Sequence, residues 1–470
     1  MSLSKLSTEI DEIIIQYLPQ HARHSLTLTS KSYHKVANPY LYRNIRVRES
    51  DALSVARFLL SLLGRTELQQ YIQSFDLISA SKRRALDAPH LGDDDPNIEA
   101  RRKTIENINQ DLFSKSLHIW KAIERFAYHL GGLTFARNWY FRVLEATKSI
   151  DGTIGLILCL ATNLESLQLM DLGDGITEAV CRAQWQECIT WASSAVWPLR
   201  KLKSLVIALE LGAAIPVLTP VETLKASGRG WLHSFEYPCE GSDKMRTLRS
   251  LELRDIAMRA DHLDCMISLP ELGGVHHLRM GNVRIEERAG YDYERLSDLL
   301  QLFLPSLRTF EWTGEIKRRR YQTYIPFGSF TGFKQLEELV LGFEYIRPND
   351  DNINDPPAHL LDPPYYFPIS LATLKITEVP QGLLHNLQET CEESPLDNFI
   401  LKTAVSRELS NFDLFVTSTG DVASEYAELS NTFLPKLIAS LDNVGTSLRF
   451  HRQRQGRDSE LLYHPDHAAV

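Results

Sequence analysis

Apolar residues near the N-terminus recur at the spacing of an amphipathic helix. The positions that share this spacing are Leu6, Ile10, Ile13, Ile14 and Leu18. Ser7 or Thr8 supplies an N-cap, and Pro19 is expected to end the helix. A second amphipathic stretch begins near His24, and we expect it to break before Pro39. A segment this short holds few large side chains, so it should rest on a partner or on the next domain.

The following part of the chain mixes helical and strand patterns. Apolar residues take helical spacing in residues 51–72, 111–130 and 138–161, and the phrase YIQSFDLIS within this part alternates as a strand does. Residues 81–103 are mostly charged or polar and contain two prolines, which predicts a surface loop. This part is therefore expected to be a helical linker with one early strand.

Beyond residue 162 an apolar triplet recurs, its members separated by two residues and then by one. It occurs as Leu164-Leu167-Leu169, Leu202-Leu205-Ile207, Leu248-Leu251-Leu253, Val275-Leu278-Met280, Leu307-Phe310-Trp312, Leu336-Leu339-Leu341, Leu371-Leu374-Ile376 and Leu396-Phe399-Leu401. Ile72-Phe75-Leu77 fits as a forerunner, whereas Leu232-Phe235-Tyr237 fits poorly because it lies 16 residues before the next triplet. Apart from the 46 residues between Leu202 and Leu248, successive triplets start 25 to 38 residues apart, which suits a strand-turn-helix unit. The pattern predicts an α/β solenoid with a curved, mostly parallel sheet and outer helices, and the alternative is an ordinary α/β domain.

Polar residues between the apolar members of each triplet should face outward, since side chains alternate along a strand. The candidates on this concave face are Ser166, Gln168, Ser250, Glu252, Arg254, His277, Arg279, Glu311, Glu338, Lys375 and Lys402. An extended surface of this kind is large enough to bind a protein. The alternative is that these positions are merely solvated.

Two further stretches depart from the repeating pattern. Residues 346–368 contain six prolines and four aspartates, which predicts an insertion between two repeats. Residues 451–470 are expected to form a flexible tail. The basic run from Lys317 to Arg320 suits either a nuclear-import patch or a solvated turn after a strand.

Composition favours a folded protein of more than one structural unit. The 470 residues are 43% hydrophobic and 24% charged, close to average globular usage. The net charge is −9, of which residues 1–50 carry +3 and the remainder −12, so we expect no nucleic-acid partner. No apolar run approaches the length of a membrane span, and acidic residues 9, 11 and 12 interrupt the region where a secretion signal would be apolar. Six cysteines without a C-x-x-C pair suit reduced thiols in a cytoplasmic or nuclear protein.

The common catalytic and cofactor motifs do not occur in the sequence. We find no phosphate-binding G-x-x-x-x-G-K-[ST], no G-x-G-x-x-G after a strand, no H-E-x-x-H and no G-x-S-x-G. His21 and His24, three residues apart, and the tail residues His464, Asp466 and His467 have metal-ligand chemistry but lack a rigid set of partners. We therefore expect no catalytic residues, no metal and no cofactor, and we expect that the chain is not an enzyme.

The N-terminal segment carries a set of residues typical of one known module. They are Leu6, Glu9-Ile10, Ile13-Ile14, Tyr17-Leu18-Pro19, Leu26, Leu28, Ser30-Lys31, Tyr33-His34, Val36-Ala37, Pro39 and Leu41-Tyr42. This segment, about a tenth of the chain, closely resembles an F-box, the helical module that docks a Skp-type adaptor. It differs in having Ser7 where proline commonly follows the first leucine, and in having no clear acidic residue before Leu26. With divergent repeats containing phrases such as TNLESLQL, the whole order resembles F-box proteins with leucine-rich repeats common in filamentous fungi.

The resemblance implies an F-box at 1–46, a helical linker at 47–150 that holds the first repeat-like strand and the charged loop 81–103, a leucine-rich-repeat-like solenoid at 151–450 and the tail at 451–470. The adaptor-binding residues it implies are Leu6, Ile10, Ile13, Ile14, Leu18, Pro19, Leu26, Leu28, Lys31, Tyr33, Val36, Pro39, Leu41 and Tyr42, some of which could equally form the internal core of the module. The substrate-binding candidates are Gln168, Glu252, Arg254, His277, Arg279, Glu311, Glu338 and Lys375.

The function implied is substrate recognition in a Skp-cullin-F-box ubiquitin ligase, with the adaptor, through it a cullin, and an unknown protein substrate as partners. The alternative is an interaction scaffold that uses an F-box without directing ubiquitination. A third class, a small-molecule receptor or hydrolase, would need a deep polar pocket among the repeats.

Overall fold

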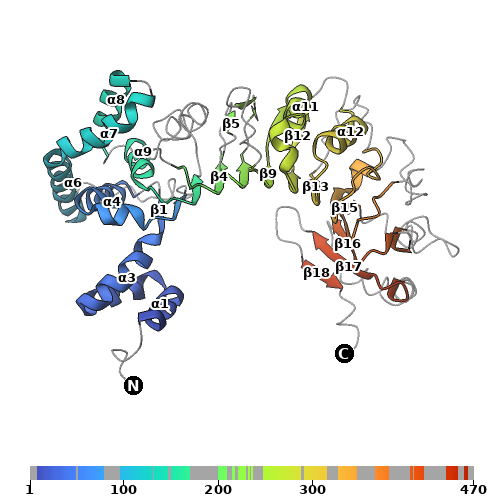
Figure 1. The fold of residues 1–470 in the computed structure, drawn as a ribbon, viewed down its shortest axis with the longest axis horizontal. Coiled ribbons are helices and arrows are strands. Elements are labelled where there is room, and N and C mark those ends of the chain that lie inside the picture. The colour runs from blue at the N-terminus through green and yellow to red at the C-terminus, as the bar shows by residue number, and fades with distance from the viewer. Residues whose placement is uncertain are drawn as a thin grey trace. The chain divides into compact units, whose positions relative to one another are not determined.

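A computed structural model of the chain describes residues 8–48, 51–78, 96–130, 132–146, 150–169, 199–208, 214–216, 221–228, 231–232, 234–236, 247–286, 291–314, 327–346, 366–380, 403–405, 407–417, 441–453 and 460–463. The chain divides into two compact units. The first unit comprises Met1–Lys225 and Phe235–Thr247, and the second comprises Ala226–Ser234 and Leu248–Val470. Their elements are labelled in Figure 1.

Three helices open the first unit: α1 (Thr8–Tyr17), α2 (Gln20–Thr29) and α3 (Lys31–Arg43). The chain turns at Pro19, as the sequence predicts, and the Ser30 hydroxyl caps α3 by accepting a hydrogen bond from the Tyr33 N–H at 3.1 Å. The predicted break before Pro39 is wrong, because α3 continues to Arg43 with this proline inside it. One lost N–H donor does not break the helix here, since α3 packs against both α1 and α2.

The rest of the first unit alternates helices with short strands. Its helices are α4 (Ala52–Gly64), the 3-10 helix η2 (Thr66–Gln70), α6 (Pro96–Ser114), α7 (Ser116–Leu130), α8 (Gly132–Leu144) and α9 (Asp151–Leu160). Its strands are β1 (Asn44–Arg48), β2 (Ser74–Ile78), β3 (Ser166–Leu169), β4 (Ser204–Ala208), β5 (Ala214–Pro216), β6 (Thr223–Ser227) and β8 (Ser234–Glu236), of which β6 and β8 each contain a point where the chain passes between units.

The helical linker differs from its sequence-based prediction at two places. Residues 96–103, expected to lie in a loop, form the start of α6, because Pro96 at the first helical position loses no hydrogen bond there. The predicted helix 138–161 is two helices, α8 and α9. Apolar periodicity continues across both, so periodicity alone did not reveal the break.

Strands β1, β2, β3 and β4 of the first unit pair in parallel, in chain order. The triplets predicted at β2, β3 and β4 are confirmed as strands whose leucine, isoleucine and phenylalanine side chains are buried. Backbone bonds just before the strands repeat from one strand to the next: Gln73 O accepts from Glu165 N, Glu165 O from Lys203 N, and Lys203 O from Glu222 N, each at 2.8 Å.

The second unit repeats this construction with a longer run of strands. Its helices are α11 (Ala260–Ile267), α12 (Tyr293–Phe303) and the 3-10 helices η4 (Pro270–Gly274) and η5 (Phe343–Ile346). Its strands are β7 (Trp231–Leu232), β9 (Ser250–Arg254), β10 (Ala257–Arg259), β11 (His277–Gly281), β12 (Arg284–Glu286), β13 (Thr309–Thr313), β14 (Glu338–Gly342), β15 (Thr373–Pro380), β16 (Asn411–Thr417), β17 (Ser447–Gln453) and β18 (Glu460–Tyr463). The main sheet has the order β9-β11-β13-β14-β15-β16-β17-β18, all parallel except the last, and β12-β10-β7 form a small parallel sheet.

The triplets predicted at β9, β11, β13, β14 and β15 are confirmed as strands. The triplet at 396–401 lies outside the described residues, and the strand that pairs with β15 is β16. Its own triplet, Leu409-Phe412-Leu414, was present in the sequence. Residues 451–453 and 460–463, assigned to the tail, form the end of β17 and all of β18, because pairing with neighbouring backbone satisfies their N–H and C=O groups. Residues 347–365 of the predicted insertion and the basic run 317–320 lie outside the described residues.

Aromatic side chains fill the core of the second unit between α12 and the sheet. Tyr293 of α12 contacts Trp312 edge-on at 5.7 Å between ring centroids, and the Phe310, Phe327 and Phe330 rings lie within 6.0 Å of one another. All of these phenylalanines and Trp312 are fully buried. Large rings on strand and helix therefore cover apolar faces that neither element could bury by itself.

Hydroxyl side chains just before three strands, β13, β15 and β17, bond to the backbone that precedes the neighbouring strand. Ser306 Oγ donates to Gly273 O at 2.8 Å, Ser370 Oγ to Leu336 O at 2.9 Å, and Thr446 Oγ1 to Leu409 O at 2.7 Å. These bonds satisfy backbone carbonyls that would otherwise be unpaired at the turns. The chain is thus an α/β protein built on a mostly parallel sheet. Within the described ranges, no helix combines the length and apolar character that crossing a bilayer requires.

Candidate functional site

Arg23 makes hydrogen bonds that link all three N-terminal helices. Arg23 of α2 donates from Nε to Ile15 O at 3.0 Å, from Nη2 to Gln16 O at 2.8 Å, and from Nη1 to Tyr40 O at 3.1 Å. It therefore links the end of α1 to α3. Few large side chains of this segment are fully buried, with Ile15 the main exception, so these polar bonds replace part of a hydrophobic core.

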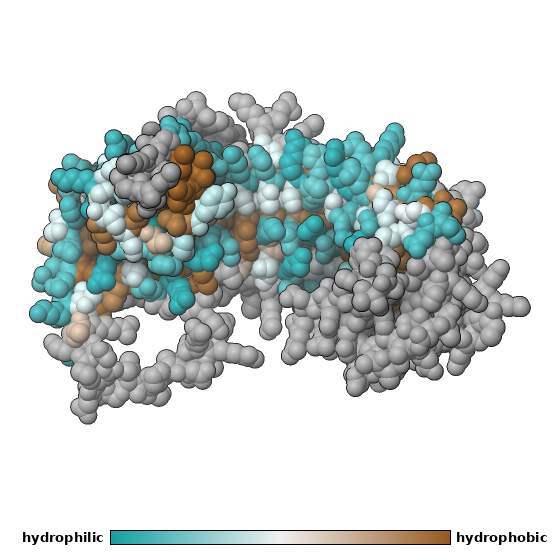
Figure 2. All heavy atoms as spheres, turned by 90° about the horizontal axis from the view of Figure 1, so that it is seen from below, coloured by the Kyte–Doolittle hydropathy of each residue, from teal (hydrophilic) through white to brown (hydrophobic). Residues whose placement is uncertain are grey.

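The outer face of α1 is apolar and open to solvent. Ile10, Ile13, Ile14 and Tyr17, which we call the α1 stripe, are 46%, 55%, 39% and 85% exposed. Their spacing of three, four and seven residues puts them on one side of the helix. Figure 2 shows the hydrophobic patch over the N-terminal helices. Clustered apolar exposure of this kind marks an interaction site more often than scattered single residues do.

The structure separates the predicted adaptor-binding residues into two groups. Those exposed to solvent are Ile10, Ile13, Ile14, Pro19, Leu28 and Lys31. Those that are half-buried are Leu18, Leu26, Tyr33, Val36, Pro39, Leu41 and Tyr42, of which Tyr42 stacks on Phe58 of α4. Leu6 lies outside the described residues. Tyr17, absent from the predicted contact set, is the most exposed of the stripe, and its position seven residues after Ile10 was the available signal.

The outward side of the second unit's sheet carries a row of polar residues in register. Glu252 pairs with Arg279, Arg279 with Glu311, and Glu311 with Val340 along neighbouring strands. The row continues from Val340 through Lys375, Asp413 and Arg449. Parallel pairing in register thus stacks residues that are about 30 positions apart in sequence.

Four residues of this row and its neighbour form an ion-pair cluster, which we call the strand cluster: Glu252, Arg254, Arg279 and Glu311. Arg254 Nε lies 2.5 Å from Glu252 Oε1 and Arg254 Nη2 lies 4.0 Å from Glu311 Oε1, while Arg279 Nε lies 3.7 Å from Glu311 Oε2. The glutamate side chains are 12% and 18% exposed, whereas those of Arg254 and Arg279 are 50% and 41% exposed. The face therefore exposes guanidinium groups that are ion-paired with less exposed carboxylates.

Two further polar groups lie along the later strands. Lys375 Nζ is 2.5 Å from Glu338 Oε1. Asp413, whose side chain is 4% exposed, lies 2.8 Å from Arg449 Nε and 3.7 Å from His451 Nε2, and the His451 ring stacks on Phe415 at 4.3 Å. Asp413, Arg449 and His451 are not among the residues predicted from the sequence, because the predicted strands do not include β16 and β17.

Among the remaining predicted residues, His277 and Gln168 also lie on strands but do not join the strand cluster. His277 is exposed, and its Nδ1 lies 3.0 Å from Thr309 Oγ1 on the next strand. Gln168, in the first unit, is in register with Asp76 and Val206. Neighbouring His276 has a pKa below its usual value of 6.5, because of burial and then because of the charges of Arg249 and Arg308. Lys402 lies outside the described residues.

Metal-ligand chemistry does not converge anywhere in the described ranges, where no three His, Cys, Asp or Glu residues are placed to hold an ion. His21 and His24 are both exposed on α2. The tail residues from 464 onward lie outside the described ranges. In comparisons with known proteins, no family model and no curated protein sequence matches the chain.

Proposed function

We propose that the chain is the substrate-recognition subunit of a Skp-cullin-F-box ubiquitin ligase. In this proposal the three N-terminal helices are an F-box that binds a Skp-type adaptor. The strand-helix units are an irregular leucine-rich-repeat solenoid that captures a protein substrate. Catalysis belongs to the partners, and the chain contributes proximity by raising the effective concentration of the substrate.

The observation that carries the proposal is the α1 stripe on a helical segment that is too small to bury it. Each isoleucine of the stripe is already about half covered, so covering the rest with a partner would contribute about 1–1.5 kcal/mol. Exposed Leu28 on α2 and Lys31 at the start of α3 add to the accessible surface of the same segment. The half-buried residues, Leu26 and Leu41 among them, then hold the helices rather than contact the adaptor.

The strand cluster supports the substrate-binding half of the proposal. Its arginines are exposed, and their geometry is defined by the carboxylates of Glu252 and Glu311. A held guanidinium loses less side-chain entropy when it binds a carboxylate or phosphate on a partner. Protein substrates with acidic segments would therefore suit this face.

The adaptor test is co-purification of the full chain with a Skp-type adaptor. Ile13→Asp places a charge in the middle of the α1 stripe and should abolish binding, whereas Leu302→Asp, at a 70% exposed residue of α12, should bind as the unaltered chain does. Circular dichroism verifies that both variants are folded. Adaptor binding by Ile13→Asp at full strength would refute the docking role of the stripe.

The substrate test uses the double variant Arg254→Ala/Arg279→Ala, which should still bind the adaptor. Proteins that accumulate in cells lacking the chain are purified and tested for binding to both forms. Binding to the unaltered chain and loss of binding to the double variant support substrate capture by the strand cluster. Turnover that does not depend on ubiquitin would instead favour a scaffold without ligase function.

A further inference from the structure

Helices α6 to α8 carry a second exposed apolar surface that the proposed function does not use. Phe113 of α6, Leu117 of α7, and Leu133 and Phe141 of α8 are 72%, 60%, 65% and 56% exposed. Exposure of four large apolar residues on adjacent helices is unusual for a surface that remains in water.

These residues form two stripes that meet. The helical turns continue from α6 into α7, since Lys115 N donates to Asp111 O at 3.1 Å and Ile119 N donates to Lys115 O at 3.0 Å. Phe113, Leu117 and Trp120 therefore follow one another at spacings of four and three residues. The Trp120 ring contacts Tyr140 of α8 edge-on at 5.6 Å, and Tyr140 lies 5.8 Å from Phe141. The α6–α8 face is defined by these residues, which are Phe113, Leu117, Trp120, Leu133, Tyr140 and Phe141.

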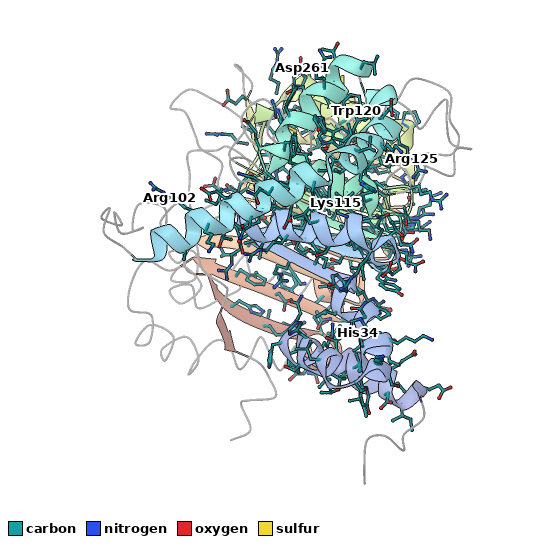
Figure 3. The ribbon with its side chains drawn as sticks, turned by 90° about the vertical axis from the view of Figure 1, so that its left-hand side faces the viewer. His34, Arg102, Lys115, Trp120, Arg125 and Asp261 are labelled. Atoms are coloured by element: carbon teal, nitrogen blue, oxygen red, sulfur yellow. The ribbon has the colours of Figure 1, made fainter. Side chains whose placement is uncertain are left out.

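The α6–α8 face lies in a basic part of an acidic chain. Residues 96–144 hold eight Lys or Arg and four Asp or Glu, a net charge of +4. Arg137 lies one turn after Leu133 and one turn before Phe141, and Lys121 lies one turn after Leu117; both cations are exposed, and neither has an ion-pair partner among the described residues. Figure 3 shows Trp120 and Arg125 on α7 and Arg102 on α6. A partner for this face therefore needs apolar anchors bordered by carboxylates.

The α1 stripe has that chemistry. Residues 8–17 contain Glu9, Asp11 and Glu12 and no basic residue, and helical geometry puts Glu9 and Asp11 at the two edges of the stripe. The stripe from Ile10 to Tyr17 extends about 10 Å along the helix, and the run from Leu133 to Phe141 extends about 12 Å. The two apolar runs thus match in length and oppose in charge.

We propose that the α1 stripe of one copy of this chain docks on the α6–α8 face of a second copy. Each copy carries one of each surface, so reciprocal docking closes at a dimer. The α1 stripe is also the adaptor surface of the proposed function, and to that extent this inference rests on it. Self-association and adaptor binding then exclude each other, which keeps the unassembled chain soluble with its apolar surfaces covered.

Sedimentation velocity of the purified full chain over a range of concentrations tests the docking without any adaptor. The unaltered chain should associate reversibly, and Phe141→Asp and Ile13→Asp should each weaken association by at least about tenfold. Leu302→Asp, which changes an even more exposed apolar residue on α12, should associate normally. Thermal unfolding by circular dichroism verifies the fold of each variant.

A charge exchange identifies the two surfaces as partners. Arg137→Glu and Asp11→Lys should each weaken association, and the double variant should recover part of the loss, because opposite charges again face each other. A chain that is monomeric at every concentration overturns the proposal. Two further results would overturn it. One is association that is weakened by variants of only one of the two faces, and the other is a double variant whose loss of association equals the sum of the two single losses.

Adding a Skp-type adaptor to the associated chain separates this inference from the proposed function. Dissociation into a chain–adaptor complex supports shared use of the α1 stripe. Self-association through both faces in a chain that never binds the adaptor would refute the proposed function and leave the docking supported. Adaptor binding to the intact dimer would overturn the docking at α1.

Discussion

The N-terminal three-helix segment and the second unit place similar apolar residues in opposite environments. Ile10, Ile13 and Tyr17 are exposed on α1, whereas Phe310 and Trp312 are fully buried in the second unit. In the helical segment, hydrogen bonds from Arg23 connect the helices. In the second unit, packed aromatic rings connect α12 to the sheet. The segment therefore leaves its large apolar residues in solvent, whereas the second unit buries its own in the core.

Removing a ring from the aromatic core should break this comparison most strongly. Phe310→Ala leaves a cavity among buried rings, and we expect the free energy of unfolding of the second unit to fall by about 3–5 kcal/mol. Ile13→Ala, on the α1 stripe, should change stability by no more than about 0.5 kcal/mol. Urea unfolding of the full chain, followed by near-ultraviolet circular dichroism, measures both. Similar losses for the two variants would contradict the contrast between the regions.

Removing the guanidinium of Arg23 should show how far the helical segment depends on polar links. Arg23→Met keeps the aliphatic length and loses three bonds to backbone carbonyls, at an expected cost of about 2 kcal/mol to the local stability of residues 8–43. Hydrogen exchange of these amides measures the change, with Lys31→Met, at an exposed lysine, as control. Unchanged exchange in Arg23→Met would mean that apolar packing alone holds the three helices.

The buried hydroxyl of Tyr366 tests the contribution of a polar group to the core of the second unit. Tyr366 Oη donates to Phe327 O at 2.6 Å in the core of the second unit, so Tyr366→Phe should cost about 1–2 kcal/mol by leaving that carbonyl unpaired. Burial also raises the pKa of Tyr366 well above its ordinary value of 10.0. Between pH 10 and the raised pKa of the folded chain, Tyr366 loses its proton in the unfolded chain but keeps it in the folded chain. The free energy of unfolding should therefore fall as pH rises above 10. Tyr366→Phe should remove part of that alkaline loss, and an identical alkaline profile would contradict this assignment.

The smallest expected effect concerns His276 at the start of β11. Its pKa is lowered by burial first and then by the charges of Arg249, Arg308 and His277, so the unfolded chain binds this proton more readily. Stability should therefore be unaffected well above pH 6.5 and should decrease as pH falls through that value. Chemical unfolding of His276→Gln at pH 7.5 and pH 5.5 should show a smaller acid loss than the unaltered chain shows. A larger acid loss in the variant would contradict the direction of the shift.

The local sequence pattern predicted correctly those strands whose inward side chains are all large and apolar. The triplets at β9, β11, β13, β14 and β15 were visible because every inward position is a large apolar residue. β6 was missed because its inward positions include Ala226, which periodicity scarcely registers. Pro39 inside α3 was misjudged because the propensity of proline to end helices is a local rule, and packing against α1 and α2 outweighs it.

The candidate sites were predictable to different degrees. Apolar spacing alone identified most of the α1 stripe, but it could not separate exposed Ile13 from half-buried Leu26, because both are large and apolar. The sequence predicted each residue of the strand cluster as outward-facing, but it did not predict the ion pairs among them. Which arginine pairs with which glutamate depends on strand register, and register brings together residues such as Arg254 and Glu311, which are separated by two connections that each contain a helix.

By itself, the sequence determined the alternation of strands and helices, the inward apolar set and the acidic, apolar character of α1. These properties follow from side-chain periodicity and composition, which act over a few residues. Only the tertiary structure decided which apolar residues stay exposed, how the charged row pairs, and that Trp120 and Tyr140 join two stripes into the α6–α8 face. Exposure and pairing depend on what the rest of the chain covers, and no local pattern records that.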